Sequence, residues 1–378
     1  MTLRVPIAPK VLKWAVERTG LSVEELAKRS QTKAVQQWLE ASAQPTLNQA
    51  EELARLAGIP FGYLLLEEPT DDTLEIADFR TPESKPLRSV SPELEELLIQ
   101  CKSRLSFYTE YSVSQAIAAP SFVGKFSLNQ SAGQAARSVS EMIDWWPGKK
   151  EVNRERVLTL ADAIEAAGVL VMRSSVVGNN TNRKLDVSEF RGFTLIDHQF
   201  ALIFVNGADA KVGQLFSLGH ELGHVLLGQP GLSGERNIHR DVERWCNSFA
   251  AGLLVSTPDL RAQFENGRDL GETAKWAYDR YGVSKDVVAW ALVDTGAINR
   301  STAQNFLLAP NDFQPPIPES SGGSFWNNLR VRLGGRFLDT VAGAVADGDI
   351  SLREASHQLG IDKAETLDTL VARFQGVA

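Results

Sequence analysis

The chain lacks most features that mark secreted, membrane or nucleotide-binding proteins. Its 378 residues include only two cysteines, Cys101 and Cys246, so a disulfide framework is excluded. No apolar run is long enough to span a membrane, and the N-terminal segment has no apolar core of signal-peptide length. Internal repeats, a phosphate-binding loop and a dinucleotide-binding glycine motif are also missing. We therefore expect a cytoplasmic protein.

Positive charge is scarce as well. The chain carries 39 Lys+Arg against 47 Asp+Glu, a formal net charge of −8, which argues against a broad nucleic-acid surface. Its length and its 43% hydrophobic content fit a protein of two or three domains with sizeable cores. The patterns described below predict a mostly helical α+β protein.

The most informative stretch is residues 214–228, QLFSLGHELGHVLLG. On a helix, His220 and His224 are one turn apart on one face, a spacing that lets two neutral imidazoles bind a single Zn²⁺. Glu221 points about 100° away from His220 and can reach a water at the metal as a general base. The five-residue pattern arises by chance in roughly one chain in a hundred of this length. The surrounding sequence must therefore decide whether it marks a metal site.

A second amphipathic helix follows and supplies the third ligand that a catalytic zinc needs. Apolar residues recur at helical spacing in VERWCNSFAAGLLVSTP (242–258), and Glu243 lies 19 residues beyond His224. Asn247 shares its face at i, i+4. Cys246 is one turn from Glu243 and is either a packing residue or an accessory thiolate ligand. Two antiparallel helices facing one metal form a zincin-like arrangement.

Catalysis also needs a hydrogen-bond donor for the transition state. The candidates are His239, Arg240, Tyr278 and Tyr281, and the sequence does not choose among them.

A small antiparallel sheet is expected immediately before the zinc helix. Three runs rich in Val, Ile and Phe, at 168–177, 189–197 and 200–207, are separated by polar turns. An exposed edge of this sheet can pair with an extended substrate and hold its scissile carbonyl near the metal. His198 falls in the turn between the last two runs and is expected to be solvated there.

Residues 10–66 read as a compact bundle of short helices that resembles the XRE-type helix-turn-helix domains of phage repressors. The resemblance rests on LSVEELAKRS (21–30), on Trp38-Leu39-Glu40, and on AEELARLAGIPFGYLL (50–65). The turn after Ser30 is shorter than in those repressors, and the third helix offers Lys33, Gln36 and Gln37 for nucleic-acid contacts but no arginine. Residues 1–66 hold eight Lys+Arg against six Asp+Glu. These departures favour protein docking or a purely structural role over DNA binding.

Linker-like segments at 67–92 and 309–324 divide the chain. We expect a helix-turn-helix domain at 1–68, a linker and helical connector at 69–148, a zincin-like metallopeptidase domain at 149–308, and a linker with a small helical C-terminal region at 309–378.

Taken together, the chain resembles the ImmA/IrrE family of bacterial zinc metallopeptidases in the form with an N-terminal XRE-like domain. The resemblance rests on IADFR (76–80), FRGFTLID (190–197), IFVN (203–206), FSLGHELGH (216–224) and the 242–258 segment. It implies His220, His224 and Glu243 as zinc ligands and Glu221 as the base. The family often has Ala or Asp where this chain has Cys246 and Asn247.

The resemblance further implies a protein substrate, an XRE-type transcriptional repressor of a mobile-element, phage or stress-response locus. The alternative is a toxin or DNA-binding regulator, paired with a small antitoxin, that acts by binding while its zinc site is dormant or structural. An intact Glu221 favours the peptidase, because a structural site needs no base. No membrane partner is expected, and the oligomeric state stays open.

Overall fold

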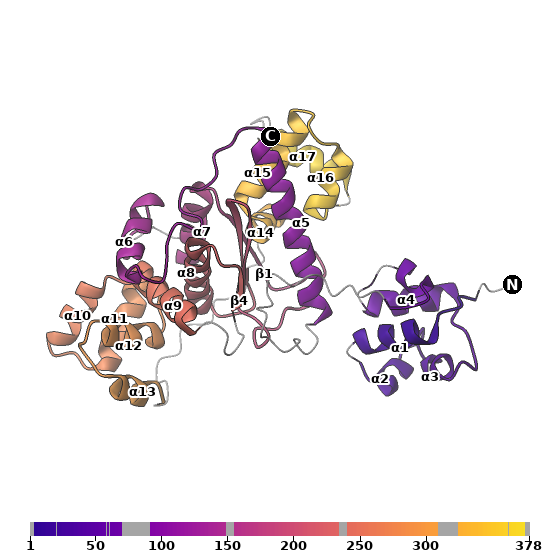
Figure 1. Cartoon of the computed structure of the whole chain (residues 1–378), viewed down its shortest axis with the longest axis horizontal. Coiled ribbons are helices and arrows are strands. Elements are labelled where there is room, and N and C mark those ends of the chain that lie inside the picture. Colours follow the sequence, from indigo (N-terminus) through magenta and orange to yellow (C-terminus); the bar gives the residue numbers. More distant parts are fainter. Residues whose placement is uncertain are drawn as a thin grey trace. The chain divides into compact units, whose positions relative to one another are not determined.

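A computed structural model describes residues 4–19, 21–57, 59, 61–69, 91–148, 155–233, 240–308, 324–361 and 363–374. The chain divides into two compact units, residues 1–100 and 101–378 (Figure 1). The two predicted linkers fall almost wholly outside the described residues, and so does the IADFR segment.

The first unit contains a bundle of short helices around one apolar core. Ser22 and Glu25 form the expected capping box at the start of α2. The core includes Val11, Leu26 and Trp38. The bundle comprises α1 (Pro9–Arg18), α2 (Val23–Ala27), α3 (Val35–Leu39), α4 (Leu47–Ala57) and the 3₁₀ helix η1 (Phe61–Leu65).

The three side chains expected to face nucleic acid are exposed in this unit. Lys33 precedes α3, while Gln36 and Gln37 lie on it. The amide of Gln36 donates to the Glu40 carboxylate at 2.6 Å, so it is already paired within its own helix.

The second unit is built around a four-stranded sheet of order β1-β3-β2-β4. Its strands are β1 (Leu170–Ser174), β2 (Gly192–Asp197), β3 (Phe200–Asn206) and β4 (Gly231–Ser233). β2 pairs antiparallel with β3 and β4, but β1 pairs parallel with β3. The expectation of an antiparallel sheet is therefore wrong for β1, and the sheet is mixed.

The sheet is mixed because of the order in which its strands pair. The pattern of apolar residues within a strand does not determine that order. A two-residue turn at His198 joins β2 to β3, so β3 folds back between β1 and β2, and all seven of its residues are buried. His198 is exposed in that turn, as expected.

Helices lie on both faces of the sheet (Figure 1). α7 (Arg156–Ala166) and α8 (Lys211–Leu227) cover one face, and α8 contacts both β2 and β3. On the other face, Tyr108 of α5 (Pro92–Ser114) packs edge-on against Phe200 with ring centroids 5.5 Å apart. α9 (Arg240–Leu254) packs along α8 and also contacts α6 (Ala132–Met142).

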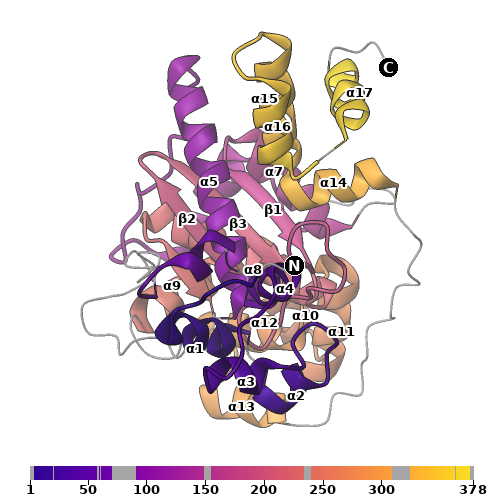
Figure 2. The same ribbon diagram turned by 90° about the vertical axis from the view of Figure 1, so that its right-hand side faces the viewer.

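The helices that follow α9 form two groups. The first group comprises α10 (Thr257–Glu265), α11 (Leu270–Tyr281), α12 (Lys285–Asp294) and α13 (Arg300–Leu308), and α12 contacts α9. The second comprises α14 (Phe325–Leu333), α15 (Gly335–Ala346), α16 (Leu352–Leu359) and α17 (Ala364–Phe374). α14 lies against β1 (Figure 2) and α15 contacts α7, so these C-terminal helices extend the second unit.

Within the part of the chain that the structure describes, no helix combines the length and the apolar character needed to cross a bilayer.

Candidate metal centre

Small residues bring α8 and α9 into close contact. A Cβ added at Gly219 would meet the Cβ of Ala250 at 3.4 Å, and one added at Gly223 would meet the Sγ of Cys246 at 3.1 Å. Gly219 and Gly223 are one turn apart, as are Cys246 and Ala250, so the two pairs lie on facing stripes. This close approach lets the Glu243 side chain of α9 reach the histidines of α8.

Cys246 is part of this packing. Its side chain is buried against Gly223. Burial, together with the charges of Glu243 and Glu221, raises the pKa of its thiol well above the usual range. Its sulfur packs against Gly223, and Cys246 is not among the three residues whose ligand atoms converge.

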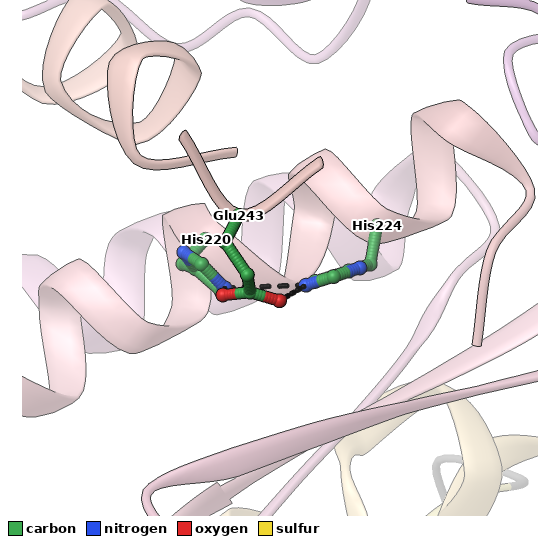
Figure 3. Close-up of side chains that lie close together, drawn as sticks. All are labelled: His220, His224 and Glu243. Atoms are coloured by element: carbon green, nitrogen blue, oxygen red, sulfur yellow. Dashed lines mark hydrogen bonds and ion pairs between the residues drawn. The ribbon is translucent and has the colours of Figure 1, made fainter. Parts of the chain in front are cut away.

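His220, His224 and Glu243 converge at one point (Figure 3). The Nε2 atoms of the two histidines are 3.2 Å apart. His220 Nε2 is 3.3 Å from Glu243 Oε2, and His224 Nε2 is 3.4 Å from Glu243 Oε1. Zinc ligands at about 2.0–2.1 Å from the metal in a tetrahedral site are themselves separated by about 3.3 Å. The three measured separations therefore fit one zinc ion.

The ring orientation of His220 also suits metal binding. Its Nδ1 lies 2.9 Å from Oδ1 of Asn247, an atom that only accepts hydrogen bonds. Nδ1 therefore carries the proton, and the lone pair of Nε2 points into the cluster. Metal-binding histidines generally hold their second nitrogen in this way. Nδ1 of His224 is buried with no hydrogen-bond partner among the described residues.

The electrostatics of the cluster favour a cation. Burial on its own would raise the pKa of Glu243, but hydrogen bonds and charges from His220 and His224 outweigh it and hold the pKa well below the usual range. Burial likewise opposes protonation of His220, yet the hydrogen bond to Glu243 raises the pKa of that imidazole. Two imidazole nitrogens and an ionised carboxylate thus face one another, and a bound metal ion would satisfy all three.

Glu221 is fully buried beside this cluster and is held from the sheet. Thr194 of β2 donates its hydroxyl to Glu221 Oε2 at 2.7 Å. A Cβ at Gly192, two residues earlier on the same face of β2, would lie 3.1 Å from both Cγ and Oε1 of Glu221. Gly192 thus leaves room for the carboxylate and Thr194 fixes its direction.

Neither Gly192 nor Thr194 is identified as a site residue by sequence reasoning. The available signal is a threonine in a strand whose other buried residues are apolar or glycine. A buried hydroxyl needs a partner, and here the partner is 27 residues away on α8.

Of the four candidate donors for the transition state, the structure describes the side chains of Tyr278 and Tyr281. Tyr281 lies in the hydrophobic core, with its hydroxyl 3.2 Å from Asp259 and its ring against Trp276. Tyr278 is half-buried on the same helix. His239 falls outside the described residues, as does the side chain of Arg240.

Comparison with known proteins identifies the domain that contains this cluster. Residues 164–292, which run from the end of α7 through most of α12, match the family model described as the IrrE N-terminal-like domain. This part of the chain is similar to IrrE-type domains. The predicted resemblance to the ImmA/IrrE family is thus confirmed for this region, and residues 1–163 and 293–378 lie outside the match.

A curated relative agrees with this assignment. Over 149 residues the chain is 31% identical to the radiation response metalloprotease IrrE of Deinococcus radiodurans. The aligned region covers 36% of this chain and 44% of that protein, so the chain matches less than half of its relative. No solved structure matches the chain.

Proposed function

We propose that the chain is a zinc-dependent endopeptidase whose metal is held by His220, His224 and Glu243. The observation that carries the proposal is the set of three separations, 3.2, 3.3 and 3.4 Å, which fit the edges of a zinc tetrahedron. The IrrE-type domain and the name of the Deinococcus metalloprotease agree with it.

The proposed chemistry assigns one task to each residue around the cluster. Zinc, when bound, would polarise the scissile carbonyl and lower the pKa of a water toward neutrality. The Glu221 carboxylate would take a proton from the attacking water and return it to the leaving amine. Thr194 keeps that carboxylate in place, and Asn247 fixes the ring of His220. Because Glu221 is buried and held in position, it supports a hydrolytic role for the metal site rather than a dormant or structural one.

An extended peptide is the substrate form that suits the sheet. α14 lies against β1 at one end of the strand order, while β4 forms the other end. A Cβ at Gly231 of β4 would lie 3.3 Å from the His224 ring, so this strand runs beside the cluster. A substrate strand added along β4 would therefore pass the metal.

The proposed substrate is a helix-turn-helix repressor or antitoxin, on the strength of the family resemblance. For the first unit we propose a protein-docking role, because α3 is only five residues long and Gln36 is paired with Glu40.

The test of the function is the Glu221→Gln variant, assayed for cleavage of a purified XRE-type repressor that the unaltered chain cleaves. Gln is nearly isosteric with Glu but cannot accept the water's proton. Loss of a general base lowers the rate by about 10²–10⁴. We expect cleavage to fall by that factor while zinc content and fold are unchanged, and the exposed-site control Glu265→Gln to cleave normally. Undiminished cleavage by Glu221→Gln would remove the mechanism.

A further inference from the structure

A cavity of about 450 Å³ lies between the C-terminal helices and the start of the zinc helix α8. Its walls come from β1, from the segment that follows β1, from the first turn of α8 and from α14. Three cationic side chains line it: Arg173, Lys211 and Arg332. The volume lies within the range of about 300–1,000 Å³ that small-molecule sites occupy.

Arg332 has an environment that is unusual for an arginine. One terminal nitrogen donates to the carbonyl of Gly178 at 3.2 Å, and Nε is buried with no hydrogen-bond partner among the described residues. Burial, followed by the positive charge of Arg104, lowers the pKa of Arg332 to about 10. The guanidinium is thus partly desolvated beside a like charge, an arrangement that an anion would stabilise.

Arg173 and Lys211 add to the positive charge of the cavity. Arg173 donates to the side-chain oxygen of Gln214 at 2.9 Å, and burial lowers its pKa although the charge of Glu155 opposes the shift. Lys211 is 3.1 Å from Glu155. Among the described residues, Lys211 is the one of these three cations that makes an ion pair, and Arg173 and Arg332 make none.

The same cavity contains the donors that anions need. Lys211 is the first residue of the 17-residue helix α8, whose free backbone N–H groups and dipole favour negative charge at this end. Ser175 adds a hydroxyl to the wall, while the hydroxyl of Ser174 donates to the Val176 carbonyl and the amide of Asn179 donates to the Gly360 carbonyl. Phe325 of α14 also lines the cavity and is 49% exposed, which leaves an aromatic surface for an uncharged part of a ligand.

We propose that this cavity binds a phosphorylated small molecule. The planar guanidinium groups of Arg173 and Arg332 match phosphate oxygens in pairs, as a lysine alone does not. A ligand bound here would bridge α14 to the helix that carries His220 and Glu221. The site is separate from the metal cluster and does not depend on the proposed peptidase activity.

Isothermal titration of the full chain with inorganic pyrophosphate and with ADP tests the proposal, with adenosine as the uncharged comparison. We expect one pyrophosphate or ADP per chain, and no heat from adenosine. Replacing Arg332 by Gln removes a charge-assisted contact and should weaken binding by about tenfold or more. The partly exposed Lys211→Gln should weaken it by about threefold, which keeps the test valid if Arg332→Gln does not fold. Arg353→Gln, at an exposed position of α16, is the matched control and should bind normally.

Zinc can itself bind phosphates, so the same titrations are repeated on Glu243→Ala, in which the metal cluster is broken. Binding that survives in Glu243→Ala and fails in Arg332→Gln supports the cavity. The proposal is overturned if neither probe binds saturably, if Arg332→Gln binds as well as the unaltered chain, or if binding disappears in Glu243→Ala alone.

Discussion

At the scale of single residues, the directions of two side chains decide what the cluster does. Asn247 turns His220 so that Nε2 faces Glu243, and Thr194 holds Glu221 so that its carboxylate stays beside the histidines. Neither Asn247 nor Thr194 belongs to the three-residue cluster. Each acts by removing the alternative orientations of a neighbour, which is how supporting residues tune a metal centre.

Thr194→Val tests this positioning role at nearly constant side-chain volume. A hydrogen bond to a charged group is worth about 1.5–3 kcal/mol, so its loss should lower kcat about 10- to 100-fold. Zinc content should be unchanged, because Thr194 contacts Glu221, the proposed base, and none of the three proposed ligands. The matched control is Thr159→Val, whose hydroxyl bonds only to carbonyls at the start of its own helix. Equal kcat values for the two variants would show that Thr194 does not position Glu221.

At the scale of secondary structure, the contact between α8 and α9 sets the metal geometry. Gly223 lies between His220 and His224 in sequence, and it is also the residue that meets Cys246 of α9. The absence of a side chain at Gly223 therefore explains why the two helices pack closely and why Glu243 reaches the histidines.

Gly223→Ala and Gly219→Ala form a matched pair on this contact. A methyl group at Gly223 would lie 3.1 Å from Cys246 Sγ and 3.2 Å from its Cα, so the helices must separate. Overpacking of this kind costs about 1–3 kcal/mol, and we expect zinc affinity to fall with stability. At Gly219 the new contacts are 3.4 and 3.5 Å, and Ala should be neutral or stabilising by up to about 1 kcal/mol.

Chemical denaturation and zinc titration of both variants provide the readout. If Gly223→Ala were as stable as Gly219→Ala and bound zinc as tightly, helix spacing would not control the metal site.

The helices of the second unit and the convergence of the cluster follow from local patterns in the sequence. The i, i+4 spacing places His220 and His224 on one face whatever the rest of the fold does, and the apolar period of 242–258 makes Glu243 face them. β4 is missed because three residues carry no periodicity, and β1 is assigned the wrong direction because pairing order depends on distant contacts. Thr194 and Gly192 are missed for the same reason, since both act on a residue of another element.

At the scale of the second unit, a buried carboxylate joins the C-terminal helices to the domain that contains His220, His224 and Glu243. Glu165 of α7 accepts hydrogen bonds from the backbone nitrogens of Gly335 and Arg336 at the start of α15, at 3.0 and 3.2 Å. Burial raises the pKa of Glu165 from 4.5 to about 7, although those two hydrogen bonds oppose the shift.

This pKa predicts a dependence of stability on pH. Between pH 4.5 and about 7 the unfolded chain has lost the Glu165 proton while the folded chain keeps it. The folded state therefore binds more protons, and the stability that Glu165 contributes falls as the pH rises through this window. A carboxyl pKa of about 7 in the folded chain, against 4.5 in the unfolded chain, corresponds to about 3 kcal/mol of unfolding free energy.

Glu165→Gln removes this titration. The free energy of unfolding of the wild type and of the variant is measured at pH 5, 6, 7 and 8. We expect the wild type to lose stability relative to the variant as the pH rises, and the difference between them to become constant above pH 7. The exposed-site control Glu141→Gln should follow the wild type throughout. Parallel curves for Glu165→Gln and the wild type would show that this carboxylate is not the group responsible.

The central claim is a single zinc ion held by His220, His224 and Glu243, and metal analysis of the purified full-length chain tests it most directly. We expect one zinc per chain in the wild type and in the control Asp241→Ala, whose side chain is 79% exposed on the same helix. In Glu243→Ala one of three protein ligands is lost, and zinc should fall well below one equivalent after dialysis against a weak chelator. Full zinc occupancy in Glu243→Ala would contradict the account.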